Sequence, residues 1–85
     1  MKESTVDLAN LELGQRAVVV AIHSGIGATG RLDAMGIRPG IVLEKVSGQP
    51  LGGPVVVKVG KNRIALGFGM ARKVYVKVYH GENAT

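Results

Sequence analysis

Glycine interrupts this chain at short intervals, and that spacing strongly constrains its fold. The 85 residues include 13 glycines, about twice the usual share of ~7%. Between the glycines lie short runs rich in β-branched residues, such as AVVVAIH at 17–23 and VVVKV at 55–59. Short runs of this kind, separated by turn residues, are typical of small all-β domains. We therefore predict a mainly β protein that forms a small barrel of about five strands.

The apolar runs and the turn residues between them predict where the elements lie. We expect strands at 16–23, 41–46, 55–59, 63–66 and 73–79, a short helix at 28–35 between the first two strands, and one helical turn in the GFGMA segment. In the last strand Val74, Val76 and Val78 alternate with basic and aromatic residues, so the valines are expected to face the core. Residues 1–15, which contain Leu8, Leu11 and Leu13 before Gly14, are expected to pack as a loose leader or turn, and residues 80–85 to form a frayed tail.

The helix is expected to be short because the segment RLDAMGIRPG contains its stop signals. Leu32 and Met35 are three residues apart and therefore share a helix face. Gly36 suits the left-handed residue just past a helix end, where Ile37 would contact Leu32 in a Schellman cap. Pro39 prevents the helix from continuing. The helix therefore has room for about two turns.

The GIGATG segment at 25–30 matches the G-x-G-x-x-G pattern of dinucleotide-binding loops, with an apolar run before it and Glu44 about twenty residues further on. That pattern requires a helix that crosses over to a parallel strand, in a unit of about 30 residues or more. Here the helix stops too early, and Glu44 lies in the middle of a predicted strand. A doubly wound nucleotide fold also needs far more chain than 85 residues. We interpret the glycines as a tight strand-to-helix connection and reject a nucleotide site.

The net charge of +5 is concentrated in one part of the chain. Residues 1–37 contain three basic and four acidic residues, whereas residues 38–79 contain eight basic residues and the single acid Glu44. A basic surface of this kind suits nucleic acid, an anionic membrane or an acidic protein, and a solvated barrel face explains it equally well. The chain has no cysteine, which excludes disulfides and thiolate metal sites.

The sequence predicts neither membrane insertion nor catalysis. No apolar run approaches the ~18 residues of a membrane helix, and the first 15 residues carry three acids and lack an apolar signal core. A soluble cytoplasmic protein is therefore expected. The serines and threonines lack an evident histidine base, and the acids do not pair in the sequence, so we expect that the protein is not an enzyme.

Three sets of residues are candidates for binding. They are a stripe on the last strand (Lys73, Tyr75, Lys77 and Tyr79), a pair on the helical turn (Phe68 and Met70) and a histidine pair (His23 and His80). The stripe could contact a partner, or follow a phosphate backbone and stack bases, and an ordinary solvated strand has the same pattern. The helical-turn pair could insert into a partner protein, or it could fill one end of the barrel. The histidines could hold a divalent ion if they met, and two surface histidines are the simpler interpretation.

Four segments in this order, RLDAMGIRPG, PLGGPVVVKV, RIALG and MARKVYV, resemble the ferrous iron transport protein A (FeoA) family. The resemblance covers about residues 8–79, and a related module is the carboxy-terminal domain of iron-dependent repressors. It implies a single SH3-like domain over 1–85, a five-stranded barrel with a helix between its first two strands and a polar tail at 80–85. The motif positions, expected mainly to build the barrel, are Leu32, Met35, Gly36, Pro39, Gly40, Pro50, Gly53, Pro54, Ala65, Leu66, Ala71 and Val76.

The resemblance also implies a function. It indicates a cytoplasmic accessory protein of bacterial ferrous iron uptake whose partner is FeoB, a membrane permease with a cytoplasmic GTP-binding domain, so that the partner would bring this chain to the inner face of the membrane. Family members are linked to transition metals, here iron or zinc, and we expect at best weak binding through His23 and His80. The resemblance leaves open whether the chain forms a homo-oligomer. The alternative is a basic nucleic-acid-binding barrel, which a steep salt dependence of oligonucleotide binding would reveal.

Overall fold

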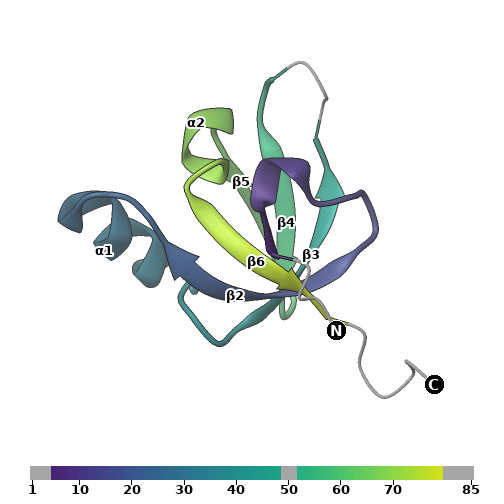
Figure 1. Ribbon diagram of the computed structural model, residues 1–85, viewed down its shortest axis with the longest axis horizontal. Helices are drawn as coiled ribbons and strands as arrows, with labels where there is room; N and C mark the ends of the chain where they lie inside the picture. The colour runs from purple at the N-terminus through teal and green to yellow at the C-terminus, as the bar shows by residue number, and fades with distance from the viewer. Residues whose placement is uncertain (1–4, 49–51, 80–85) are drawn as a thin grey trace.

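The structure, a computed structural model, describes residues 5–48 and 52–79, which form one antiparallel sheet of six strands with short helical segments (Figure 1). In chain order the elements are β1 (Thr5–Asp7), the 3-10 turn η1 (Leu8–Asn10), β2 (Arg16–Ile22), α1 (Ile26–Ala34), β3 (Val42–Ser47), β4 (Val55–Val59), β5 (Asn62–Leu66), α2 (Phe68–Ala71) and β6 (Val74–Val78). The strands lie side by side in the order β1-β6-β2-β3-β4-β5. Among the described residues, no helix is long and apolar enough to cross a bilayer.

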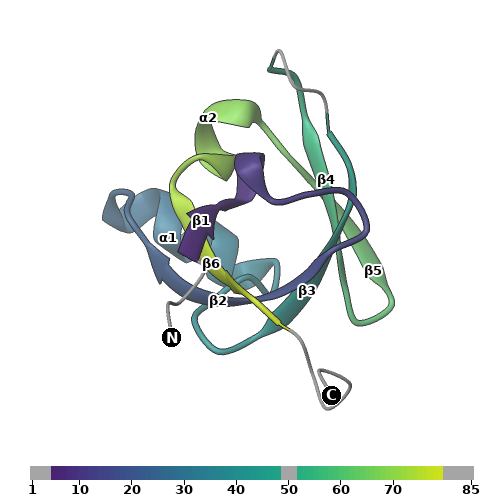
Figure 2. The ribbon, with the colours of Figure 1, turned by 45° about the vertical axis from the view of Figure 1, so that its right-hand side comes forward.

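The predicted mainly β fold, with a short helix between the first two long strands, is confirmed. The helix α1 connects β2 to β3, and it spans 26–34 where 28–35 was expected. The predicted helical turn is α2, immediately before β6. Within the described residues, β1 and β5 are the two edge strands of the sheet and are not paired with each other. The sheet curls around the core, as Figure 2 shows.

The prediction of a loose leader or turn missed the strand β1, whereas the turn is present as η1. β1 pairs with β6 through Val6 and Val76, which adds a sixth strand to the five expected. The side chains of Leu8 and Leu11 are buried in the core, and the leader ends in a backbone hydrogen bond from Gly14 to β3. The leader packs in this way because it covers an otherwise unpaired strand edge and because its two leucines fill the interior of the curl.

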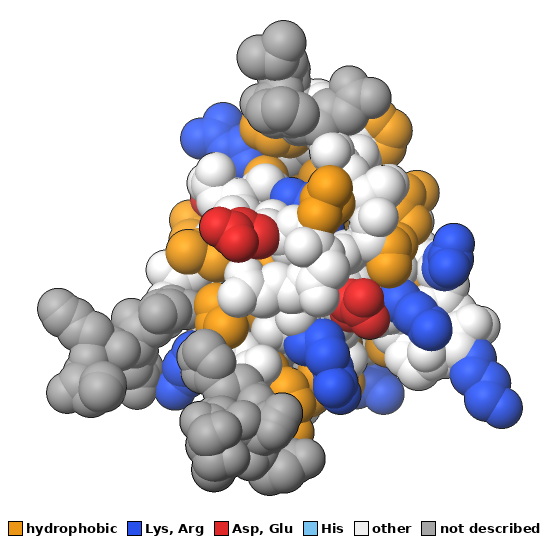
Figure 3. All heavy atoms as spheres, turned by 90° about the vertical axis from the view of Figure 1, so that its right-hand side faces the viewer, with side chains coloured by type: hydrophobic (Ala, Val, Ile, Leu, Met, Phe, Trp, Pro, Cys, Tyr) orange, Lys and Arg blue, Asp and Glu red, His pale blue; other side chains and the backbone are white. Residues whose placement is uncertain are grey.

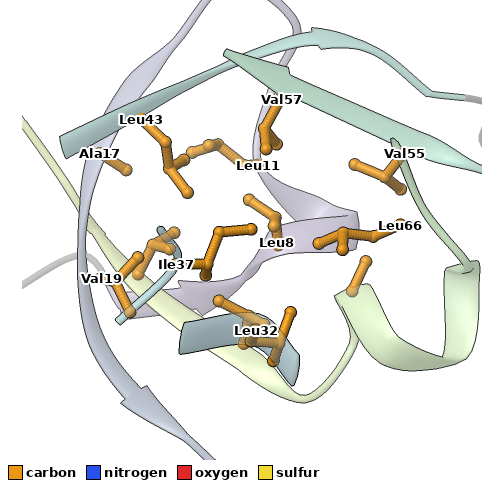
Figure 4. Packing of buried hydrophobic residues seen from close by; sticks show 13 residues of the cluster. Leu8, Leu11, Ala17, Val19, Leu32, Ile37, Leu43, Val55, Val57 and Leu66 are labelled. Atoms are coloured by element: carbon orange, nitrogen blue, oxygen red, sulfur yellow. The ribbon is translucent and has the colours of Figure 1, made fainter. Parts of the chain in front are cut away.

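The core lies inside the curl of the sheet and receives side chains from strands, helices and leader (Figure 4). Its buried apolar residues are Leu8, Leu11, Ala17, Val19, Leu32, Ile37, Leu43, Val55, Val57, Leu66, Ala71, Val74 and Val76. Figure 4 shows Leu8 near the centre and Leu32 of α1 below it. In β6, Val74 and Val76 are buried, as the alternation predicted, and Val78 is partly buried against the same cluster.

The predicted helix cap is confirmed. Gly36 has a φ of +94°, the left-handed conformation that glycine adopts readily. The Ile37 amide donates a hydrogen bond to the Leu32 carbonyl at 2.8 Å, and the Gly36 amide donates to the Asp33 carbonyl at 2.9 Å, which is the Schellman pattern. Leu32 and Ile37 are both buried. Met35, predicted on the same face as Leu32, is instead 42% exposed, because it lies at the C-cap beyond the last helical residue.

A buried lysine, which no pattern in the sequence indicated, joins the leader to the sheet. Lys45 on β3 is 5% exposed, and its Nζ donates hydrogen bonds to the carbonyl oxygens of Ala9 at 2.8 Å and Leu11 at 2.7 Å. Burial lowers the pKa of the Lys45 ammonium below its ordinary value, and the negative charge of Asp7 partly offsets this effect. Gly48 leaves room for the lysine, since a Cβ at that position would lie 2.8 Å from Lys45 Cε.

Candidate functional site

A largely apolar groove lies between α1 and the segment that follows it. Its volume is about 460 Å³, within the range of about 300–1,000 Å³ that is typical of ligand pockets. The groove, called the α1 groove below, is lined by Ile22, Ser24, Ile26, Thr29, Gly30, Asp33, Ile37, Arg38 and Pro39. Three isoleucines and a proline supply its apolar part, so the groove could receive an apolar side chain of another molecule.

The helix α1 projects from the body of the molecule. Figure 1 shows it at the far left, beyond the end of β2. Of the nine described residues of α1, Leu32 is the buried one, whereas Ile26 in the first turn is 92% exposed. Ile26 is itself one of the residues that line the α1 groove, so this exposed side chain adds to the apolar part of the groove. Continuous apolar surfaces mark interaction sites more often than isolated exposed residues do.

Two glycines inside α1 weaken the helix without serving its packing. Glycine in a helix is destabilising by about 0.5–1 kcal/mol relative to alanine. Apart from its chain neighbours and the backbone of α1 itself, a Cβ added at Gly27 or Gly30 would meet no described atom within 4 Å, so neither glycine is required by close packing against other elements. Their bare backbone instead gives α1 a smooth outer surface that another chain can approach closely.

We expect Gly27→Ala and Gly30→Ala each to raise the free energy of unfolding by about 0.5–1 kcal/mol, because alanine favours the helix and the added methyl group has room. Urea unfolding of each variant beside the wild type measures the change. Gly40→Ala is the contrasting control, since Gly40 has a φ of +100° and alanine would be strained there. Destabilisation by the two helix variants would show that these positions do not lie in an exposed helix.

The rim of the α1 groove is polar. Arg38 Nη1 lies 3.3 Å from Asp33 Oδ1 and also donates a hydrogen bond to the Asp33 carbonyl at 3.1 Å. Ser24 and Thr29 share a hydrogen bond between their hydroxyl oxygens at 3.3 Å. An exposed ion pair contributes little to stability. Because the pair borders an apolar groove, it instead offers a bound partner one hydrogen-bond donor, on Arg38, and one acceptor, on Asp33.

The predicted stripe on β6 does not line the α1 groove. Lys73 and Tyr79 are exposed, and Tyr75 and Lys77 are half-buried. The Tyr75 ring packs against His23, with ring centres 4.6 Å apart, and the Arg16 guanidinium carbon lies 5.3 Å from the Tyr79 ring centre. The alternation along β6 was therefore predicted correctly, whereas the role of the stripe as a partner surface stays a prediction.

The helical-turn pair and the histidine pair lie apart from the groove. Phe68 and Met70 are half-buried; Met70 packs against the core, and Phe68 borders a second hollow with Lys45. His23 follows β2, and His80 lies outside the described residues. Within the described ranges, no group of three or more histidine, cysteine, aspartate or glutamate residues could hold a metal ion. Metal binding through the histidines stays a prediction.

Three of the motif glycines have a left-handed backbone conformation. Gly36, Gly40 and Gly53 have φ values of +94°, +100° and +98°, a conformation that favours glycine. Pro39 is exposed and borders the α1 groove. Pro54 is exposed before β4, and Pro50 lies outside the described residues.

Ile26 was missed as a candidate site residue, although the sequence contained a signal. It stands between two glycines in the GIGATG segment, which drew attention only as a nucleotide pattern. Ile26 is six residues before Leu32, so on a helix of 3.6 residues per turn it points away from the buried face. An aliphatic residue that is out of phase with the buried face is a sequence-level indication of a contact surface.

Comparison with known proteins gives a consistent result. The model of the FeoA domain matches residues 6–78. A protein of Methanocaldococcus jannaschii named Fe(2+) transport protein A is 38% identical over 78 residues, which cover 89% of this chain and 93% of that protein. A crystal structure of an iron uptake regulatory protein (FeoA) has a TM-score of 0.82 at 33% identity and covers 88% of this chain and 99% of its own. A manganese-dependent transcriptional repressor also has a TM-score of 0.82, over 93% of this chain and 44% of its own, and at 16% identity that likeness shows the fold alone.

Proposed function

The chain belongs to the FeoA family, and from that membership we propose that it acts in ferrous iron uptake by direct contact with the permease FeoB. The family is associated with ferrous iron transport, and its members are accessory proteins without enzymatic activity. We place the protein in the cytoplasm, at the inner face of the membrane when it is bound to FeoB. Its role is that of an adaptor, which requires a contact surface and no catalytic group.

The observation that supports this proposal most is the exposed Ile26 in the lining of the α1 groove. Ile26 is 92% exposed, and Ile22, Ile37 and Pro39 line the groove with it. A partner that inserted an apolar side chain there would remove this surface from water, at about 25 cal/mol for each Å² buried. The bare backbone at Gly27 and Gly30 would allow the partner to approach α1 closely.

We expect Ile26→Ser to weaken the affinity for the cytoplasmic part of FeoB about 10- to 100-fold, because burial of an isoleucine contributes about 1.5–3 kcal/mol to binding. The free energy of unfolding should change little, since the side chain is already exposed in the free protein. Titration calorimetry with purified proteins measures the affinity. Leu13→Ser is the matched control, because Leu13 is also exposed, at 61%, and lies outside the α1 groove.

Equal losses of affinity in both variants would indicate a general effect of surface hydrophobicity and would contradict the assignment to the groove. Unchanged affinity in Ile26→Ser would place the FeoB contact elsewhere. The predicted surface made of Lys73, Tyr75, Lys77, Tyr79, Phe68 and Met70 would then be the next to test, with Lys73→Glu and Lys77→Glu combined.

A further inference from the structure

A row of outward-facing side chains crosses the sheet on the side opposite the core. The strand register places Arg16 of β2 beside Glu44 of β3, Glu44 beside Lys58 of β4, and Lys58 beside Arg63 of β5. The three basic side chains are exposed and Glu44 is half-exposed. Tyr79 continues the row beyond Arg16, since its amide donates a hydrogen bond to the Arg16 carbonyl at 2.8 Å. These residues are called the basic row below.

The cations of the basic row have no ion-pair partner in the described chain. No carboxylate of the described residues lies within 4 Å of the charged groups of Arg16, Lys58 or Arg63, although Glu44 is the cross-strand neighbour of two of them. Lys61, in the turn between β4 and β5, adds another exposed cation nearby. In the view of Figure 3, lysine and arginine side chains gather over the lower half of the face. The outer face of the sheet is therefore positively charged and open to solvent.

We propose that the basic row rests against an anionic lipid surface. Lysine and arginine near the surface of an anionic bilayer each contribute about fivefold to binding. The row extends over four adjacent strands, about 14–15 Å at the usual strand spacing, so several of its cations could contact the headgroups of one bilayer. A shallow hollow of about 320 Å³ lies along it, bordered by Arg16, Glu44 and Lys58, where a lipid phosphate could enter.

The position of Glu44 favours lipid over an acidic polypeptide. An acidic strand laid along the row would bring one of its carboxylates directly over Glu44, between Arg16 and Lys58. Lipids exchange places in the bilayer, so a neutral headgroup could lie below Glu44 while anionic headgroups gather at the cations. Tyr79 at the end of the row is 39% exposed, and tyrosine is favoured at the headgroup level of membranes.

The same geometry disfavours nucleic acid. Binding of single strands combines cations with aromatic rings on which successive bases stack. In the basic row, Arg16 lies over the ring of Tyr79, and no other aromatic residue is part of the row. The proposal goes beyond contact with FeoB, because the basic row and the α1 groove have no residue in common. A chain held on the bilayer would reach a permease by lateral diffusion.

The test is binding of the full-length protein to vesicles of phosphatidylcholine with and without phosphatidylglycerol, measured by co-sedimentation. Lys58→Gln with Arg63→Gln should weaken binding to the anionic vesicles about 25-fold, and Glu44→Gln should strengthen it about fivefold. The control is Arg72→Gln with Lys73→Gln, which removes the same charge from the turn before β6, at the opposite end of that strand from Tyr79, and should retain most of the binding.

Equal weakening by the two double variants would show that net charge alone acts, and this would overturn the proposal. Failure to bind anionic vesicles would overturn it as well, as would tighter binding to an oligonucleotide or to polyglutamate than to vesicles at the same salt concentration. The affinity of Glu44→Gln and of Lys58→Gln with Arg63→Gln for the cytoplasmic part of FeoB, measured without lipid, should stay unchanged. Loss of vesicle binding can therefore be distinguished from failure of the FeoB contact.

Discussion

Leu32→Ala is expected to lower the free energy of unfolding by about 2–5 kcal/mol, because it removes a large buried side chain and leaves a cavity. Leu32 is 1% exposed and is the residue through which α1 reaches the core (Figure 4). The whole domain has about 4–13 kcal/mol of stability for a chain of this length. Thermal unfolding should therefore shift downward by at least about 8 °C, and the proposed binding to FeoB should weaken because α1 no longer holds the groove in place.

Met35→Ala is the control for this prediction. Met35 is three residues further along and 42% exposed, so its truncation should lower the free energy of unfolding by no more than about 1 kcal/mol. If Leu32→Ala unfolded at the same temperature as Met35→Ala, α1 would not be attached through Leu32. In that case the α1 groove would not be a fixed feature of the protein.

Lys45→Met is expected to lower the free energy of unfolding by about 2–4 kcal/mol. Methionine keeps the apolar stem but leaves the carbonyls of Ala9 and Leu11 without the ammonium that now bonds them, and each unsatisfied buried group costs about 1–3 kcal/mol. Relief of the buried charge offsets part of that loss. Denaturant unfolding measures the change. Gly48→Ala should act in the same direction, because its Cβ would displace Lys45 Cε, whereas Gly67→Ala, where a Cβ meets no described atom within 4 Å, is the control.

The pH dependence separates the buried charge from a simple loss of packing. Because the pKa of Lys45 is lowered in the folded protein, the unfolded chain binds more protons between that lowered value and the ordinary value of about 10.4. Stability rises with pH wherever the unfolded state binds more protons. The advantage of the wild type over Lys45→Met should therefore grow as the pH is raised through this window. A difference that did not change with pH would contradict a buried, charged lysine.

Local patterns predicted those parts of the fold that local physics controls. The alternation in 73–79 and the stop signals at Gly36 and Pro39 depend on nearest neighbours along the chain, and both predictions hold in the structure. The leader and Lys45 depend on distant residues instead. Lys45 shares the inward phase of Leu43 on β3, and its carbonyl partners are 34 and 36 residues earlier. Nothing near it in the sequence shows that a buried ammonium would be bonded.

The candidate site was harder to predict than the fold. The residue types along β6 showed that its outer stripe is basic and aromatic. They do not show which residues of other strands lie beside one another on the same face of the sheet. Arg16, Lys58 and Arg63 come from three strands that are far apart in the sequence, so the basic row exists only through the register of the sheet. Ile26 became a candidate only once α1 was seen to be attached through Leu32.

The place of β6 between β1 and β2 has a consequence for synthesis of the chain. β2 ends at Ile22, and the strand that covers one of its edges ends at Val78. At about 5–20 residues per second, the ribosome needs about 3–11 s to make the intervening stretch, and during that time the apolar AVVVAI strand has one unpaired edge. β1 must wait as long, because its partner in the sheet is also β6. The sheet can therefore be completed only after Val78 has been made, and until then the nascent protein depends on its leader and on the β2–β3–β4–β5 meander alone.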